Sequence, residues 1–159
     1  MRVGVGYDVH RFKEGRPLIL GGVRVPHHAG LDGHSDADVL THAVCDAVLG
    51  AAALGDIGAV FPDTDDQYKG ADSLRLLEEV VAMAAAKGLR PHNVDAVVVA
   101  EQPRLAPYIG EMRVRLGPVL GLPAEAVSVK ATTSEGLGFT GREEGIAAQA
   151  VCTLREEAP

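Results

Sequence analysis

Apolar and polar positions alternate along residues 2–10, with the two-residue period of a β-strand. The apolar positions are Val3, Val5, Tyr7 and Val9. On the opposite face of such a strand, Asp8 and His10 project in the same direction, with Cα atoms roughly 6.6 Å apart. The pattern therefore predicts an N-terminal strand that presents a carboxylate and an imidazole side by side.

Three later segments repeat apolar residues every three or four positions, which is typical of amphipathic helices. We expect these helices at residues 35–54, 72–88 and 106–116. Ser35 to Asp38 supply an N-cap and an acidic first turn for the first helix, and Asp72 or Ser73 caps the second. The Gly117-Pro118 pair is expected to disturb the end of the third helix, because proline lacks an N–H donor.

Shorter apolar runs predict β-strands at residues 94–100, 127–131 and 146–154, with a hairpin at residues 18–25. Segments 27–33, 55–65 and 132–142 are expected to be irregular. This order of elements predicts an α+β fold for a single domain spanning residues 1–159. We expect two layers, in which three helices cover one face of a mixed four-stranded sheet, plus the small N-terminal hairpin.

The central strands are apolar on both sets of alternating positions, but three helices can cover only one face of such a sheet. The second face must therefore be buried in another way. Self-association of the chain is the simplest way to bury it.

Composition narrows the possible partners. The chain has 15 Lys and Arg residues against 22 Asp and Glu residues, a formal net charge of −7 at pH 7. With no basic cluster and few aromatic residues, we expect no nucleic-acid partner. No apolar run approaches the roughly 18 residues of a membrane span, and no signal segment is evident, so we expect a cytoplasmic protein without a membrane partner. Cys45 and Cys152 lie in apolar patterns and are expected to be buried rather than disulfide-bonded.

A metal site is the first candidate for chemistry. His42 lies on the first predicted helix, and together with Asp8 and His10 it would supply three ligands and leave one position open, as in catalytic zinc sites. Cys45, three residues after His42, is the competing ligand.

Two carboxylates flank His42 at a spacing of one helical turn. Metal-bound histidines usually donate their second ring N–H to an acceptor, so Asp38 or Asp46 is expected to orient His42.

Two further segments could bind anions. His34 and Ser35 precede the first predicted helix, where free backbone N–H groups favour an anion, although ordinary capping by Ser35 is the alternative. Residues 130–135 (KATTSE) combine a lysine, three hydroxyls and backbone amides that could surround phosphate oxygens. Glu135 there offers a hard oxygen ligand for a magnesium-type ion, and a plain glycine-rich turn is the alternative.

Six motifs in this order resemble the 2-C-methyl-D-erythritol 2,4-cyclodiphosphate synthase family. They are residues 4–12 (GVGYDVHRF), 34–38 (HSDAD), 54–58 (LGDIG), 61–65 (FPDTD), 130–133 (KATT) and 138–142 (GFTGR). The resemblance spans essentially the whole chain. Several long motifs together are far more specific than any one of them.

The resemblance implies a homotrimer of α+β subunits with sheets facing the centre and active sites between adjacent subunits. The implied reaction converts 4-diphosphocytidyl-2-C-methyl-D-erythritol 2-phosphate into the cyclic diphosphate and CMP, a lyase step of non-mevalonate isoprenoid (terpenoid) biosynthesis. Asp8, His10 and His42 would hold zinc, and Glu135 would hold magnesium or manganese. His34 and Thr133 match positions that stabilise the transition state.

The resemblance also implies a set of substrate-binding residues. Besides Asp8, His10, Glu135 and the two catalytic positions, these are Val9, Ser35, Asp56, Ile57, Gly58, Phe61, Pro62, Asp63, Thr64, Asp65, Ala100, Pro103, Arg104, Leu105, Ala106, Thr132, Ser134, Phe139 and Arg142. Those at 100–106 match a cytidine pocket, where family members commonly have Lys-Met-Leu instead of Arg104-Leu105-Ala106. Phe139 and Arg142 match positions near an apolar cavity on the trimer axis that can hold an isoprenoid phosphate.

Two other functions remain open from the residues alone. A zinc hydrolase would use the same three ligands to activate water, with Asp46 or Asp56 as the base. A non-catalytic trimeric binding protein would use the metal only for stability.

Overall fold

The main sheet has five strands in the order β4-β1-β7-β5-β6. In the computed structural model, which describes residues 1–157, these strands are β1 (Arg2–Glu14), β4 (Ala29–Leu31), β5 (Leu89–Val99), β6 (Val127–Thr132) and β7 (Gly145–Glu156). Only the β5–β6 pair is parallel, so the sheet is mixed as expected. The predicted hairpin is confirmed as β2 (Leu18–Leu20) and β3 (Val23–Val25).

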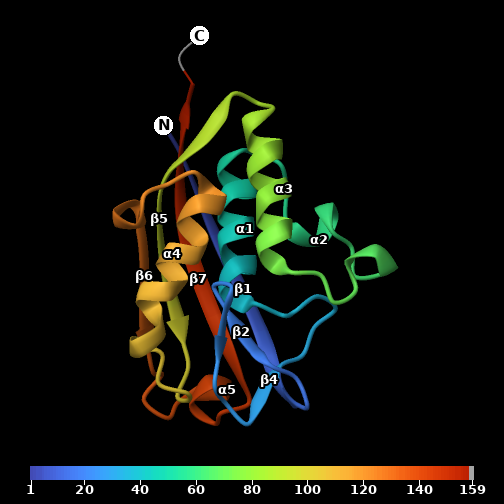
Figure 1. Cartoon of the computed structure of the whole chain (residues 1–159), viewed down its shortest axis with the longest axis vertical. Helices are drawn as coiled ribbons and strands as arrows, with labels where there is room; N and C mark the ends of the chain where they lie inside the picture. The colour runs from blue at the N-terminus through green and yellow to red at the C-terminus, as the bar shows by residue number, and fades with distance from the viewer. Residues whose placement is uncertain (158–159) are drawn as a thin grey trace.

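Three long helices cover one face of this sheet, which confirms the two-layer arrangement (Figure 1). They are α1 (Val39–Ala51), α3 (Ser73–Ala85) and α4 (Ile109–Leu120). Short helical turns lie in the connections: α2 (Ile57–Val60), α5 (Gly138–Gly141) and the 3-10 turns at Asp66–Tyr68, Ala106–Tyr108 and Ala124–Ala126. None of the helices in residues 1–157 combines the length and apolarity needed to cross a bilayer.

The predicted number of strands was wrong, because β4 was expected to be irregular. This strand is only three residues long, too short to show a period, and it pairs with Phe12 to Glu14 at the far end of β1. β1 itself continues four residues beyond His10. The fifth strand therefore exists through a long-range pairing that a local pattern does not reveal.

Two helix boundaries also differ from the prediction. Asp38, not Ser35, is the N-cap of α1, because Ala37 has a left-handed φ of 58° and cannot belong to the helix. The third helix begins at Ile109 and continues through Pro118 to Leu120. Pro118 lies in the last turn, so its missing N–H costs one intrahelical hydrogen bond, and the helix ends two residues later.

The closest approach between the two layers lies where α1 crosses β1. A Cβ atom on Gly4 would lie 2.1 Å from the carbonyl oxygen of Ala47, and one on Gly6 would lie 1.9 Å from that of Ala43. Only glycine permits this backbone contact. The same face of β1 carries Asp8 and His10 further along, so the contact brings α1 next to both side chains.

The opposite face of β1 is apolar and uncovered by the described part of the chain. Val3, Val5, Tyr7 and Val9 on this face are 68%, 60%, 56% and 43% exposed. Val151 of the neighbouring β7 pairs with Val5 and is also exposed. The expectation that helices cover only one face is therefore confirmed, and the second face remains available for a partner.

We expect Gly6→Ala to lower the free energy of unfolding by about 1–3 kcal/mol or more, because its methyl group would overlap the backbone of α1. Gly50→Ala is the matched control: its Cβ would have no atom closer than 3.7 Å, and it lies inside α1. This control should be neutral or stabilising by about 0.5–1 kcal/mol, through helix propensity. Chemical denaturation measures both changes. Equal effects of the two substitutions would contradict the close contact.

Candidate active site

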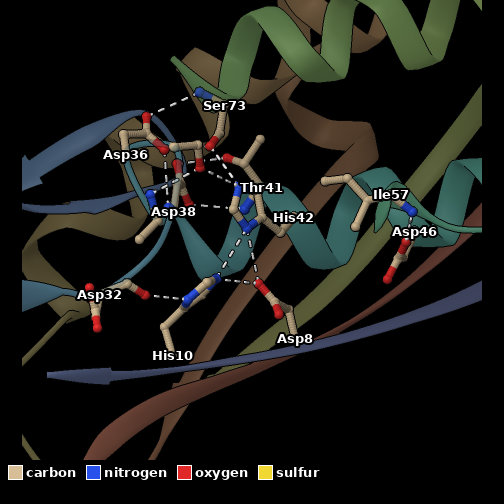
Figure 2. Close-up of polar contacts among 12 residues, drawn as sticks. Asp8, His10, Asp32, Asp36, Asp38, Thr41, His42, Asp46, Ile57 and Ser73 are labelled. Atoms are coloured by element: carbon tan, nitrogen blue, oxygen red, sulfur yellow. Dashed lines mark hydrogen bonds and ion pairs between the residues drawn. The ribbon is translucent and has the colours of Figure 1, made fainter. Parts of the chain in front are cut away.

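Asp8, His10 and His42 meet at the contact between β1 and α1, as the sequence predicts (Figure 2). The Asp8 Oδ2 atom lies 2.9 Å from His10 Nε2 and 3.0 Å from His42 Nδ1, and the two nitrogens are 3.3 Å apart. Zinc ligands at about 2.0–2.1 Å in a tetrahedron lie roughly 3.3 Å from one another. The three atoms therefore have nearly the spacing of one face of a zinc coordination sphere. Cys45, the competing ligand, does not belong to this group.

His10 is oriented for metal binding by a backbone contact. Its Nδ1 atom lies 2.6 Å from the carbonyl oxygen of Asp32. A carbonyl can only accept, so Nδ1 carries the proton and donates it. In the neutral ring, Nε2 is then a lone pair facing the Asp8 carboxylate. Two acceptors at 2.9 Å require a cation or a proton between them, so this donor set fits a metal ion.

The pKa shifts of Asp8 and His10 also fit a metal ion at this site. Burial on its own would raise the pKa of Asp8, but the hydrogen bonds and charges of His10 and His42 lower it to about 2. Burial would lower the pKa of His10, and the Asp8 carboxylate outweighs this effect and raises it. The site thus stabilises a negative carboxylate together with a positive charge beside it.

The prediction that Asp38 or Asp46 orients the His42 ring was wrong. The Asp38 carboxylate is fully buried and accepts from Gly21 N, Gly22 N, Thr41 N and Thr41 Oγ1. It caps α1 and fixes the turn of the β2–β3 hairpin. Asp46 accepts from the Ile57 N–H at 2.7 Å and holds the first turn of α2 (Figure 2).

The His42 ring instead contacts two serine hydroxyls. Its Nε2 atom lies 2.8 Å from Ser73 Oγ and 3.1 Å from Ser35 Oγ. Helical spacing missed these partners, because Ser73 comes from the start of α3, 31 residues away. Only the tertiary packing of α3 against α1 brings it to the ring.

A pocket of about 280 Å³ opens beside the three ligands. The predicted residues that line it are Asp8, His10, His34, Ser35, His42, Ile57, Gly58, Phe61 and Asp63. His34 also contacts the carbonyl oxygen of Asp65 through Nε2, at 3.0 Å. Asp56 caps α2 at the pocket edge by accepting from Ala59 N.

Three lining residues were missed by the sequence analysis: Gly33, Tyr68 and Leu76. Tyr68 packs edge-on against Phe61, with ring centroids 5.1 Å apart. Leu76 belongs to the apolar pattern of α3, which is typical of any core position. No local signal distinguishes these residues from ordinary packing.

Other predicted residues lie away from this pocket. Val9 projects from the opposite face of β1 and lines a separate hollow of about 750 Å³, together with Phe12 and Phe139. Arg142 pairs with Glu144 at 3.1 Å near this hollow. The structure thus places Val9 and Phe139 in a hollow that His10 also lines, outside the pocket that all three ligands share.

The predicted residues at 100–106 and 132–135 form a second group at the ends of β5 and β6. The Ala100 N–H donates to the Thr132 carbonyl at 3.0 Å, so segments 100–106 and 132–135 lie together. Within the described chain, neither segment lines the pocket of the three ligands. One chain therefore carries two halves of the predicted site at separate places.

The backbone amides expected to hold phosphate are partly occupied. Glu101 Oε1 accepts from Ser134 N at 2.9 Å and from Gly136 N at 3.3 Å. Lys130 pairs with Asp95 at 2.6 Å. The carboxylate of Glu135 stays exposed, with a contact of 3.2 Å from Thr133 Oγ1. In this turn the exposed oxygen ligand, rather than the amides, is the available chemical group.

The two-layer fold and the three-ligand pocket fit a metal-dependent class of enzyme. Comparison with known sequences is more specific: the sequence matches the YgbB family over residues 1–155. The chain therefore belongs to the YgbB family. It is 64% identical over 155 residues to the 2-C-methyl-D-erythritol 2,4-cyclodiphosphate synthase of Salinibacter ruber, with 98% of this chain and 99% of the relative covered. It is 61% identical to that of Synechococcus elongatus over 153 residues, 96% of each chain.

Solved structures agree with this assignment. A 2C-methyl-D-erythritol-2,4-cyclodiphosphate synthase in a CDP-bound form superimposes with a TM-score of 0.89 at 37% identity, covering 97% of this chain and all of that one. The bifunctional IspDF from Campylobacter jejuni superimposes with a TM-score of 0.95 at 43% identity. That match covers 98% of this chain, which spans 42% of the length of the bifunctional protein.

We expect Asp46→Leu to expose the Ile57 amide to hydrogen exchange about tenfold faster or more, because a hydrogen bond to a charged group contributes about 1.5–3 kcal/mol. Asp46→Asn keeps an acceptor oxygen and should retain most of the protection. Zinc content, measured by elemental analysis, should be unchanged in both variants. Loss of zinc in Asp46→Leu would instead support a role for Asp46 at His42.

Proposed function

We propose that this protein converts 4-diphosphocytidyl-2-C-methyl-D-erythritol 2-phosphate into 2-C-methyl-D-erythritol 2,4-cyclodiphosphate and CMP. The observation that carries the proposal is the meeting of Asp8, His10 and His42 in a chain that resembles these synthases over nearly its whole length. The reaction is a lyase step of isoprenoid biosynthesis.

The nucleophile in this reaction belongs to the substrate. An oxygen of the 2-phosphate forms a bond to the β-phosphorus, and the bond from that phosphorus to the oxygen bridging it to the α-phosphate breaks. That oxygen leaves with CMP and takes the electron pair of the broken bond. The protein therefore needs to bring two anionic groups together and stabilise the added charge, not to supply a nucleophile.

His34 and Thr133 are proposed to stabilise the transition state. His34 lines the pocket beside the three ligands, and its contact with the Asp65 carbonyl fixes the ring. Ser35 lines the same pocket, and Asp56, Ile57 and Gly58 are proposed to bind the methylerythritol hydroxyls at its edge. The adjoining segment 61–65 (Phe61, Pro62, Asp63, Thr64 and Asp65) would close over them.

Two cations are proposed to balance the charge of the substrate. Zinc would be held by Asp8, His10 and His42, and magnesium or manganese by Glu135, whose exposed carboxylate is a hard oxygen donor. When bound, both ions would act as Lewis acids that withdraw negative charge from phosphate oxygens. These ions would offset the electrostatic repulsion between a chain of net charge −7 and a polyanionic substrate.

A homotrimer is proposed because one chain holds the two halves of the site apart. The cytidine-binding residues Ala100, Pro103, Arg104, Leu105 and Ala106, with Thr132, Thr133, Ser134 and Glu135, would complete the pocket of an adjacent subunit. The uncovered apolar face of β1 and β7 would be buried at the centre of the trimer. The CDP-bound relative is consistent with a cytidine diphosphate-linked substrate.

Two minor expectations complete the proposal. The hollow lined by Val9 and Phe139, with Arg142 nearby, would lie toward the trimer axis and could hold an isoprenoid phosphate. The cytoplasmic location remains a prediction from the sequence.

We expect His42→Ala to reduce turnover at least about 10²-fold, because a group that holds the charge-stabilising ion is lost. The trimer should persist in light scattering. His92→Ala, an exposed histidine on β5, is the matched control and should keep full activity. Loss of trimer together with zinc would favour a structural metal and a non-catalytic binding protein. Linear phosphate products instead of cyclic diphosphate would favour a zinc hydrolase.

We expect Glu135→Gln to weaken the magnesium or manganese requirement of turnover while leaving zinc content intact, because its carboxylate lies apart from the three zinc ligands. The amide keeps the size of the side chain but loses its charge. Elemental analysis and a metal titration of activity measure the two effects. An equal loss of both metals would refute the assignment of Glu135.

A further inference from the structure

A largely buried series of hydrogen bonds lies behind His42, on the side away from Asp8 and His10. It runs from His42 Nε2 to Ser73 Oγ, 2.8 Å away, and on to the Asp36 carboxylate (Figure 2). Ser73 is the first residue of α3 and is completely buried. These contacts are polar and reach a proposed metal ligand, so the hydrogen bonds bear on which protons the His42 ring carries.

The direction of each hydrogen bond follows from its partners. An ionised carboxylate only accepts, and a serine hydroxyl has one proton to give. The Ser73 hydroxyl donates to Asp36 Oδ1, so its oxygen is left to accept from His42 Nε2. His42 therefore carries its proton on Nε2, and its Nδ1 atom faces Asp8 as a lone pair.

Asp36 is itself held so that both oxygens must accept. Oδ2 accepts from Ser73 N at 3.1 Å, and Oδ1 accepts from Asp38 N at 3.1 Å. The backbone N–H of Asp36 donates to the Ala71 carbonyl at 3.0 Å. The carboxylate therefore has a fixed place and a fixed role, which is to accept the proton of the Ser73 hydroxyl.

We propose that Ser73 and Asp36 are positioning residues that keep His42 in the Nε2–H tautomer and so leave Nδ1 free to bind the metal. The proposal rests on the metal site of the proposed function and deepens it. Without an acceptor at Nε2, the neutral ring would place its proton on Nδ1, because Asp8 Oδ2 lies 3.0 Å from that atom and can accept the proton. The Ser73 hydroxyl, as an acceptor at Nε2, favours the other tautomer.

Ser35 takes a lesser part in the same arrangement. Its hydroxyl oxygen lies 3.1 Å from His42 Nε2 but also accepts from Ala37 N at 3.2 Å. Among the described contacts, no carboxylate accepts the Ser35 proton. The contacts therefore do not fix whether Ser35 Oγ donates to His42 Nε2 or accepts from it, as they do for Ser73. The acceptor that sets the tautomer is therefore Ser73.

The test uses the zinc-loaded full chain. We expect Ser73→Ala and Asp36→Ala each to bind zinc about tenfold more weakly or worse, which is the usual effect of losing an outer partner of a ligating histidine. Asp36→Ala removes the acceptor but leaves the Ser73 side chain in place, and so keeps the test valid if Ser73→Ala does not fold. Zinc affinity is measured by competition with a chromophoric chelator.

Thr41→Val is the matched control. Thr41 is a buried residue whose hydroxyl also donates to an aspartate, Asp38, at 2.7 Å, but it does not contact the His42 ring. Its removal should lower stability and leave zinc affinity at the wild-type level. Nitrogen-15 NMR of the histidine side chains gives the direct readout: a hydrogen-bonded proton on His42 Nε2 in the wild type and in Thr41→Val, weakened or lost in the other two variants.

Different outcomes would overturn the metal site itself and the role of Ser73 and Asp36. A wild-type chain that binds no zinc would overturn the metal assignment of the proposed function. A wild-type chain that binds zinc, with Ser73→Ala and Asp36→Ala equally tight, would overturn the role of Ser73 and Asp36 alone. A wild-type His42 proton on Nδ1 would overturn it as well.

Discussion

The chemistry of this protein depends on one steric constraint, the direct contact between the backbones of β1 and α1. Gly4 and Gly6 remove the side chains that would otherwise separate the helix from the strand. His42 on the helix then reaches Asp8 and His10, which lie further along the same face of the strand. A conventional spacing between helix and sheet would leave the three ligand atoms too far apart to share one ion.

The sequence predicted those features that local patterns encode. Alternation placed Asp8 and His10 on one face, apolar periodicity located the three helices, and long motifs identified the family. It failed at two other places that long-range contacts decide. β4 forms only because the end of β1 pairs with it, and His42 Nε2 contacts Ser73 at the start of α3 and Ser35 before α1 rather than residues of its own helix. Spacing along a helix indicates which residues are neighbours on that helix, but not which neighbour a ring nitrogen selects.

The two halves of the predicted site are each well ordered within one chain but do not meet there. Segments 100–106 and 132–135 are joined by backbone and side-chain bonds, and the three-ligand pocket is built separately between β1, α1 and α3. Each half is therefore preorganised before any assembly takes place. Association of subunits would then require little local folding, which lowers the entropy cost of completing the site.

The Glu101 carboxylate has a consequence for selectivity. By occupying the amides of Ser134 and Gly136, it turns a loop of the kind that often attracts bare anions into one that is already neutralised. Free phosphate and other simple anions of the cell gain little from such a loop. A ligand that arrived with its own cation, or met the cation proposed at Glu135, would gain more there, so the loop would discriminate against the commonest competitors of a diphosphate.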